Sequence, residues 1–207
     1  MDFFDRLEDV RSRWNVLEHS FYVRWSNGEL SAEELACYAG EYRHVVVALA
    51  DGLAAAERSA PPDLRAGLRE HVAEEAAHVG LWDDFARAAG AEPDVDPLPE
   101  TRDCVAAWTG GRDMLEGLVA AYAIESGQPA ISRTKLDGLL GHYGFEEGPA
   151  TAYFSLHATL DEQHAASSRE LIAERLDGAD EQALLAVAEG ALRGNWRLLD
   201  GVERACA

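Results

Sequence analysis

The chain has 207 residues and a formal net charge of −20, with 47% hydrophobic and 27% charged residues. This is the composition of an ordinary globular protein, so a disordered chain is excluded, and the length suits one well-buried core. The negative charge repels nucleic acid and anionic membranes alike, so neither is expected as a partner. Apolar runs such as Val45–Ala50 are far too short to cross a bilayer.

Two further features bear on the compartment. The stretch Met1–Asp5 lacks the basic and then apolar regions of a signal peptide, which predicts a cytoplasmic protein. Cys37, Cys104 and Cys206 are odd in number and far apart in the sequence. We therefore expect neither a CxxC metal site nor a disulfide framework.

Almost every segment shows the apolar spacing of three and four residues that indicates an α-helix. Ser31 and Glu34 form a capping box at the start of a long helix. Pro61-Pro62-Asp63 is expected to break the chain and to cap a helix that ends at Gly90. Besides the helix that ends at Gly90, the expected helices cover about residues 3–17, 31–59, 101–108, 113–126, 129–142, 149–177 and 180–203.

The remaining segments are short. An aromatic element over residues 19–25 ends at Asn27-Gly28, and residues 91–100 form the only linker. A linker of this length is a crossover between helices rather than a domain boundary. No stretch alternates with the period of two that is typical of a strand. The sequence predicts an all-α fold with a single domain over 1–207, a bundle of about seven to eight helices.

Two of the expected helices carry the same arrangement of side chains, His71-x3-Glu75-x2-His78 and His157-x3-Asp161-x2-His164. Positions i, i+4 and i+7 of an α-helix fall on one face, so each stretch aligns an imidazole, a carboxylate and a second imidazole. Nitrogen and oxygen donors of this kind suit iron, manganese or zinc. The repeat predicts a pair of metal ions inside the bundle.

Single carboxylates from other helices would complete such a site. Glu125 and Glu41 each share a helix face with apolar and aromatic residues, so both are expected to point inward. An ionised carboxylate buried without a partner costs several kcal/mol or more. Because only 18 Lys and Arg face 38 Asp and Glu, metal ions are the expected partners. Whether His71 is a ligand stays open, since a lone histidine on an apolar face is more often a hydrogen-bonded core residue.

Further stretches, together with the two stripes, carry a family resemblance: Leu17–Trp25 with Gly28–Leu30, Glu74-Glu75 with His78 and Leu81-Trp82, Glu125-Ser126, and Tyr153-Phe154 ahead of His157. On these residues the chain resembles the haem-oxygenase-like dimetal oxidases, relatives of thiaminase II and pyrroloquinoline quinone synthase C, over about residues 3–177. Within them it is most similar to the para-aminobenzoate synthases, the group of the chlamydial protein associating with death domains.

The resemblance implies a haem-oxygenase-like bundle that binds two metal ions, di-iron or iron with manganese, and uses O₂ as co-substrate. An extra carboxylate found in several oxidases of this fold matches Glu41, which would be a seventh ligand. Relatives on this fold are often dimers, so a homodimer is one expectation and the oligomeric state stays open. The metal ligands carried over by the resemblance are Glu75, His78, Glu125, His157, Asp161 and His164.

The resemblance also implies a specific reaction. In para-aminobenzoate synthases a tyrosine of the enzyme itself is consumed to make the product, and a lysine is regarded as the source of the amino group. Tyr22 matches that tyrosine, and Lys135, ten residues after Glu125, matches that lysine. Lys135 is the only lysine in the chain. The most specific function implied is para-aminobenzoate formation in small-molecule biosynthesis, with Tyr22 and Lys135 as catalytic residues.

Two departures leave alternatives open. The synthases space the first glutamate and histidine further apart than Glu75 and His78 stand here, and residues 42–50 are less aromatic than theirs. The tighter spacing is more similar to oxidases of free amino acids or fatty acids on the same fold, which would act on a small-molecule substrate. A third alternative is a non-catalytic interaction protein whose metal is structural or absent, and a fourth is a cofactorless enzyme similar to the quinone synthase.

Overall fold

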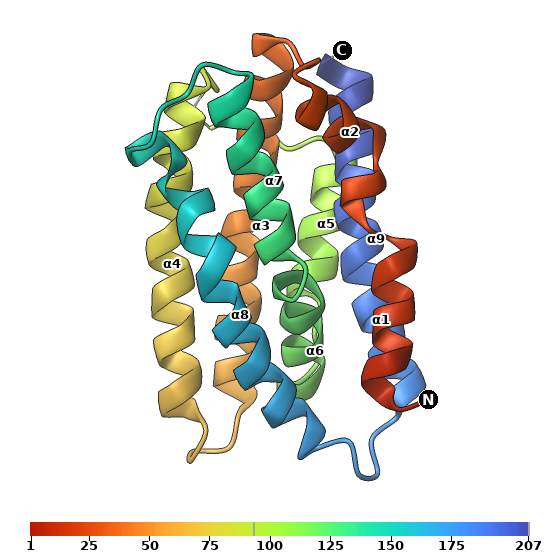
Figure 1. The fold of residues 1–207 in the computed structure, drawn as a ribbon. Coiled ribbons are helices and arrows are strands. Elements are labelled where there is room, and N and C mark those ends of the chain that lie inside the picture. The colour runs from red at the N-terminus through yellow and green to blue at the C-terminus, as the bar shows by residue number, and fades with distance from the viewer. Residues whose placement is uncertain (93, 207) are drawn as a thin grey trace.

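The computed structural model describes residues 1–92 and 94–206. Within those residues the chain forms helices, turns and loops without a strand, so the predicted all-α class is confirmed. The helices run along one common direction and place the two chain ends at opposite ends of the bundle (Figure 1). They are α1 (Phe3–Arg13), α2 (Ser20–Asn27), α3 (Ala32–Ser59), α4 (Arg65–Ala88), α5 (Pro99–Thr109), α6 (Met114–Glu125), α7 (Gln128–Gly141), α8 (Ala152–Ala173) and α9 (Glu181–Cys206), with 3₁₀ turns η1 (Val16–Glu18) and η2 (Pro149–Thr151).

The helix ends show which of the predicted capping signals are present in the structure. The capping box at the start of α3 is present, with the Ser31 side chain accepting from the Glu34 N–H and the Glu34 carboxylate accepting from the Ser31 N–H. The aromatic element after residue 18 is itself a helix, α2. The expected cap at Asp63 is wrong: α4 starts at Arg65, and its N-cap residue, Leu64, makes no side-chain cap. None of the helices in the described residues has the length and apolar character needed to span a bilayer.

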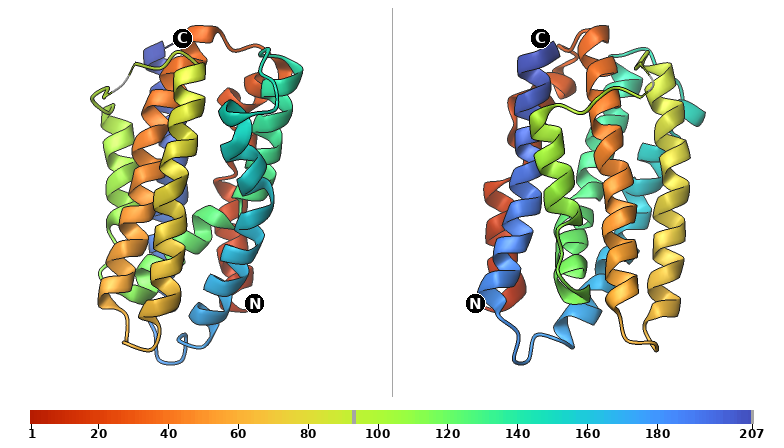
Figure 2. Two further views of the ribbon diagram at one scale, coloured as in Figure 1. Left: turned by 90° about the vertical axis from the view of Figure 1, so that its left-hand side faces the viewer. Right: turned by 180° about the vertical axis from the view of Figure 1, so that it is seen from behind.

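The helix α3 is the centre of the packing. It contacts α4, α5, α6 and α9, and its antiparallel neighbour α4 lies beside it along nearly its whole length (Figure 2). On the other side of the molecule α8 packs against α7 and α6, and α2 packs against α7. This arrangement encloses the inner faces of α3, α4, α6, α7 and α8 around one interior.

The helix α6 packs inside the bundle and forms one wall of that interior. It is apolar nearly all round and buried along most of its length, as expected for a helix surrounded by others. Gly117 allows α6 to approach α3 closely, because a Cβ at this position would lie 2.8 Å from the Ala56 Cβ. The last residue of α6 is Glu125, 1% exposed. The close contact of α6 with α3 therefore holds a carboxylate in the middle of the molecule.

The cysteines depart from the sequence expectation. Cys37 of α3 and Cys206 at the end of α9 form a disulfide across 169 positions of sequence, with Cα atoms 6.3 Å apart. The prediction that no cysteines pair is therefore wrong for these two residues. Cys104 is free and buried, and burial raises the pKa of its thiol. The spacing of the cysteines in the sequence could not predict this pair, because the two residues meet only through the packing of α9 against α3.

Candidate metal centre

Three helices bring the predicted ligands into one buried cluster. The inner face of α4 carries His71, Glu75 and His78, the inner face of α8 carries His157, Asp161 and His164, and α6 contributes Glu125. All are buried except His71, which is half-buried. The i, i+4, i+7 spacing of the two stripes is what turns these side chains toward each other across the interior.

One end of the cluster joins all three helices. The Nε2 atom of His71 lies 2.9 Å from Glu125 Oε1, and Nδ1 of His164 lies 3.4 Å from Glu75 Oε1. One ligand atom from each of these four residues falls within 4.8 Å of the others. This end has two imidazoles and two carboxylates, a donor set that suits iron or manganese. His71, left open from the sequence, is among the residues brought together.

The other end uses α4 and α8. Nδ1 of His78 lies 3.2 Å from Glu75 Oε1, and Nε2 of His157 lies 3.8 Å from Glu75 Oε2. The ligand atoms of these three residues form a second close group. Because Glu75 belongs to both groups, its carboxylate is positioned to bridge two ions. Asp161 stands beside them, with Oδ1 3.8 Å from Nδ1 of His164.

Hydrogen bonds outside the cluster fix two of the imidazoles. Nδ1 of His157 is 2.8 Å from the Tyr153 carbonyl, which only accepts, so Nδ1 carries the proton and the Nε2 lone pair faces the interior. Nε2 of His164 is 2.9 Å from Glu74 Oε2, which turns the Nδ1 atom inward. Outer carbonyl and carboxylate partners of this kind orient histidines that bind metals.

Unpartnered atoms concentrate in this cluster. In the described residues, 14 buried side-chain nitrogen and oxygen atoms have no hydrogen-bond partner, and nine of these belong to the seven residues of the cluster. Several lie at ion-pair distances from one another without the alignment of a hydrogen bond. Buried polar atoms normally have hydrogen-bond partners. Nine unpartnered nitrogen and oxygen atoms that could each bind a metal ion therefore fit a site for cations.

Buried glutamates elsewhere have found other partners. Glu34 pairs with Arg24 and Glu116 with Arg112. Glu41, expected as a further ligand, is buried as predicted, but its Oε2 accepts from the Leu98 N–H at 3.0 Å and from the Thr101 hydroxyl. The structure does not bring Glu41 into either group of ligand atoms. Its burial is explained by these two hydrogen bonds rather than by an ion.

The pKa values of three cluster residues indicate that positive charge stabilises the cluster. Burial alone would raise the pKa of Glu75, yet the surrounding imidazoles hold it well below its usual range. Burial raises the pKa of Asp161 to about 7, and the charges of Glu125 and Glu75 add to the effect. Burial lowers the pKa of His164, but Glu75 and Glu74 outweigh it and raise the value to about 9. Divalent cations would supply this charge, and the residues present fit them.

Lys135 lies in an aromatic box next to the cluster. Its side chain is fully buried, and Nζ has no hydrogen-bond partner among the described residues. Nζ stands 4.5 Å from the ring centroid of Tyr42 and 5.6 Å from those of Tyr22, Tyr38 and Trp82. Burial lowers its pKa to about 7, against a smaller opposing effect of the Asp161 charge. Near neutral pH a large share of this amine is uncharged.

Tyr22 forms one wall of the same box. Its hydroxyl is 2.7 Å from the hydroxyl of Tyr38, and burial raises the pKa of both phenols. Tyr153 connects the box to the cluster, because its ring stacks on His157 at 3.9 Å between centroids and meets Trp82 edge-on at 4.9 Å. Aromatic contacts are thus continuous from a histidine of the cluster to the walls around Lys135.

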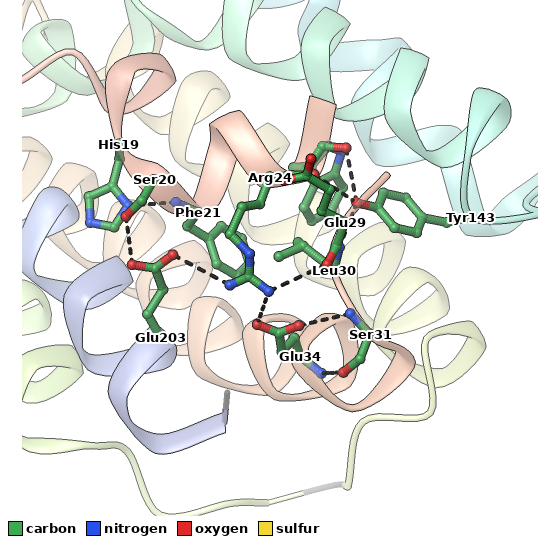
Figure 3. A network of polar contacts seen from close by, with 11 residues as sticks. His19, Ser20, Phe21, Arg24, Glu29, Leu30, Ser31, Glu34, Tyr143 and Glu203 are labelled. Atoms are coloured by element: carbon green, nitrogen blue, oxygen red, sulfur yellow. Dashed lines mark hydrogen bonds and ion pairs between the residues drawn. The ribbon is translucent and has the colours of Figure 1, made fainter. Parts of the chain in front are cut away.

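A polar network holds α2, and so Tyr22, against the rest of the bundle (Figure 3). The guanidinium of Arg24 donates to Glu34 of α3 at 2.6 Å and lies 3.6 Å from Glu203 of α9. The Tyr143 hydroxyl donates to the Trp25 carbonyl at 2.9 Å. These contacts join α2 to three other segments, which fixes the orientation of its buried face.

The cluster opens to solvent at one end. A cavity of about 390 Å³ is lined by His71, His164 and Glu74, and Asp63 and Glu70 also belong to its lining. Its acidic lining favours the passage of cations over anions. Sequence reasoning found the stripes but missed Tyr38, Tyr42 and Trp82 as walls of the box. A signal was present, because Trp82 follows His78 by one helical turn and Tyr38 precedes Tyr42 by one turn.

Comparisons with known proteins agree with this arrangement. Residues 37–196 match the family described as iron-containing redox enzyme. A 4-aminobenzoate synthase of Nitrosomonas europaea is 31% identical over 99% of this chain and 93% of its own length. A 4-aminobenzoate synthase of Chlamydia trachomatis is 33% identical over 87% of this chain and 84% of its own length.

Solved structures share the fold at low sequence identity. A TenA homologue from Pyrococcus horikoshii superposes with a TM-score of 0.80 at 16% identity, over 99% of both chains. A CADD-like protein of unknown function from Nostoc punctiforme gives a TM-score of 0.74 at 18% identity, again over 99% of both chains. At these identities the likeness supports the bundle architecture.

Proposed function

The chain belongs to the haem-oxygenase-like family of iron-containing redox enzymes, and from that premise we propose that it forms 4-aminobenzoate with Tyr22 and Lys135 as the consumed residues. Membership makes the protein a metal-using oxidoreductase. The finer assignment rests on its similarity to proteins named 4-aminobenzoate synthase and on the chemistry of the box around Lys135.

One observation carries the proposal. The single lysine of the chain is fully buried with no hydrogen-bond partner in the part of the chain that the structure describes, and its Nζ lies 5.6 Å from the ring centroid of Tyr22. A buried amine without a partner destabilises a fold, so retaining one needs a reason beyond packing. The product contains an aromatic ring and an amine, and both groups stand side by side here in a dry interior.

The residues that would hold the metal ions are His71, Glu75, Glu125 and His164 of one group and His78 and His157 of the other, with Glu75 common to both and Asp161 beside them. Two redox-active ions bound there, iron with iron or iron with manganese, would supply the electrons for reducing O₂ and the oxidising power for the organic reaction.

The other residues would prepare the reacting groups. Burial keeps a large share of Lys135 as the free amine, the nucleophilic form, at neutral pH. Tyr38 holds the Tyr22 hydroxyl by a hydrogen bond of 2.7 Å, which fixes the orientation of the Tyr22 ring. The aromatic walls exclude water, which would compete with the amine for an oxidised ring.

The metal assignment is tested by anaerobic loading with ferrous iron and elemental analysis. We expect two ions per chain, and fewer in Glu125→Gln and His164→Ala. Glu41→Gln is the matched control, because Glu41 is equally buried but engaged by Leu98 and Thr101, and it should retain both ions. Full occupancy in Glu125→Gln would contradict the ligand set.

The reaction is tested by exposing the loaded protein to O₂ with a reductant and measuring 4-aminobenzoate and the mass of the peptide that contains Tyr22. We expect at most one product molecule per chain, together with loss of mass from that peptide. Tyr22→Phe and Lys135→Arg should each abolish the product while metal content stays unchanged. An intact Tyr22 after many turnovers would reject the proposal.

A second candidate is an oxidase that acts on a free substrate. The cavity of about 390 Å³ that reaches His71 and His164 from solvent favours it, because it can admit a small molecule to the cluster. Its acidic lining, with Glu70, Glu74 and Asp63, favours an amine-bearing substrate over a fatty acid. More than one turnover per chain with a free amino acid, and an unmodified Tyr22, would identify this function.

A further inference from the structure

A second cavity lies on the other side of the central helices from the acidic opening. It is enclosed by α1, the segment 14–17, α6, α7 and α9, and has a volume of about 150 Å³. We propose that this cavity binds a small aromatic acid that carries a hydrogen-bond donor, with 4-aminobenzoate as the ligand. The identity of this ligand rests on the proposed function, whereas its chemical class rests on the cavity itself.

The size and lining of the cavity suit one aromatic ring. Its walls are mainly apolar and include Trp14, Val16, Ile124, Ile131 and Leu192. An apolar cavity of about 150 Å³ in another protein holds benzene. The indole of Trp14 is anchored by donation from Nε1 to Glu189 Oε1 at 3.2 Å. One rigid aromatic wall is therefore available to a ligand ring.

Asn195 gives the cavity a buried acceptor. This α9 residue is 7% exposed and lines the cavity, and its Oδ1 has no hydrogen-bond partner among the described residues. A buried carbonyl oxygen left without a donor costs free energy. The other asparagine in the lining, Asn15, is already engaged, since its side chain accepts from the Leu17 N–H. A ligand amino group would satisfy Asn195.

Arg11 gives the cavity a cation at its edge. The Glu8 carboxylate accepts hydrogen bonds from Nε and Nη2 of Arg11 at 2.8 and 2.5 Å. Nη1 lies on the cavity side, where a Cβ placed on Gly127 would be 3.7 Å away. This nitrogen is free to donate to a carboxylate. An aromatic ring with an acid at one end and an amine at the other matches the two polar groups of the lining.

The cavity adjoins the aromatic box. Gly127 lines the cavity, and its neighbour in the chain, Gln128, donates from Nε2 to the Tyr42 hydroxyl at 3.4 Å. The Tyr42 ring is in turn 4.5 Å from Lys135 Nζ. Gln128 and Tyr42 therefore connect the cavity to the reactive amine, so a product formed there has a receiving site away from the metal cluster.

The test is calorimetric titration of the whole protein with three ligands: 4-aminobenzoate, benzoate, which lacks the amine, and aniline, which lacks the acid. We expect one site per chain that binds 4-aminobenzoate at least tenfold more tightly than either of the others. Ala130→Trp should remove this binding, because Ala130 is an exposed residue of the cavity lining and a larger side chain there covers the mouth. Binding that persists in Ala130→Trp would place the ligand elsewhere and overturn the proposal.

Two further variants assign the ends of the ligand. Asn195→Leu should weaken 4-aminobenzoate about tenfold and leave benzoate unchanged, whereas Arg11→Gln should weaken both acids about tenfold and leave aniline unchanged. Arg13→Gln is the matched control, since Arg13 is exposed and absent from the lining. Equal losses for all three ligands would indicate general disruption and reject the assignment. Arg11→Gln and Ala130→Trp alter partly exposed positions and keep the test valid if Asn195→Leu fails to fold.

This titration needs no turnover, so its outcome separates from that of the proposed function. A chain that binds 4-aminobenzoate in the cavity but makes none retains the cavity proposal and loses the function. A chain that makes the compound and does not bind it in the cavity retains the function and loses the cavity proposal.

Discussion

Lys135 shows how one residue can indicate function through the free energy that its burial costs the folded protein. Its side chain is long and ordinarily solvated, yet here it is fully buried among aromatic rings, and residues 1–92 and 94–206 offer Nζ no hydrogen-bond acceptor. Cation–π contacts with Tyr42 and its neighbours offset part of the desolvation of the ammonium form. They do not offset all of it, since the pKa still falls to about 7. The fold therefore holds this residue at a loss of stability.

That loss predicts a pH-dependent gain from Lys135→Met. The unfolded chain keeps the lysine proton up to about pH 10.5, whereas the folded chain releases it above about pH 7. Between these values the unfolded state binds more protons, so wild-type stability rises with pH. The variant should be more stable than wild type below pH 7, and the difference should shrink towards pH 10.

Urea unfolding at several pH values between 6 and 10 would measure this difference in the free energy of unfolding. Leu139→Met is the control for side-chain exchange, because Leu139 is also buried on α7 but does not titrate. A gain for Lys135→Met that is independent of pH would show that the lysine is not strained by burial.

Glu125 and Glu41 mark the limit of what the sequence could predict about single residues. Both sit on inward helix faces, and burial was predicted correctly for both. Their difference comes from contacts distant in sequence: Glu41 meets Leu98 and Thr101, 57 and 60 positions away, whereas Glu125 meets the half-buried His71. A single helix face reports burial and does not report which partner lies opposite.

At the level of elements, periodicity predicted the helices within a few residues because most of the helices bury one face and expose the other, with α6 as an exception that is buried nearly all round. Local chemistry was less reliable: the Ser31 capping box formed, but Asp63 does not cap α4. The short helix α2 was predicted only as an aromatic element. Its structure depends on the network around Arg24, whose partners come from α3 and α9, and such partners are invisible in a local window.

The contact between α2 and α7 gives a prediction about elements. A Cβ on Gly138 would clash with Nε1 of Trp25, and that indole is buried and donates to the Lys135 carbonyl at 3.1 Å. Gly138→Ala should force the two helices apart and lower the free energy of unfolding by about 1–3 kcal/mol. It should also reduce 4-aminobenzoate formation, since Tyr22 and Lys135 sit on these two helices.

Gly141→Ala is the matched control for this prediction. Gly141 ends the same helix, and a Cβ there would meet nothing within 4 Å. Chemical denaturation followed by circular dichroism would compare both variants with wild type. If Gly138→Ala is as stable as Gly141→Ala, the close approach of α2 to α7 does not determine the geometry of the box.

The disulfide acts on the whole molecule, because Cys37 and Cys206 close a loop of 169 positions. A cross-link over so long a loop restricts the unfolded chain and contributes about 2–4 kcal/mol of stability. Adding a reductant should therefore lower the melting temperature of wild type by about 5–15 °C. Cys37→Ser should melt at the lower temperature already and should not respond to reductant. A wild-type protein that melts equally with and without reductant would show that the bond does not form in solution.

The placement of the single ε-amine has a practical consequence for following the folding of this chain. Reagents that acylate amines cannot reach Lys135 while the bundle is closed, and there is no second lysine to react in its place. A brief pulse of such a reagent, followed by intact-mass measurement, would count the molecules that have opened, because each opened chain gains one acyl group on this side chain in addition to any on the exposed α-amine of Met1. The native protein thus carries its own stoichiometric reporter of transient exposure.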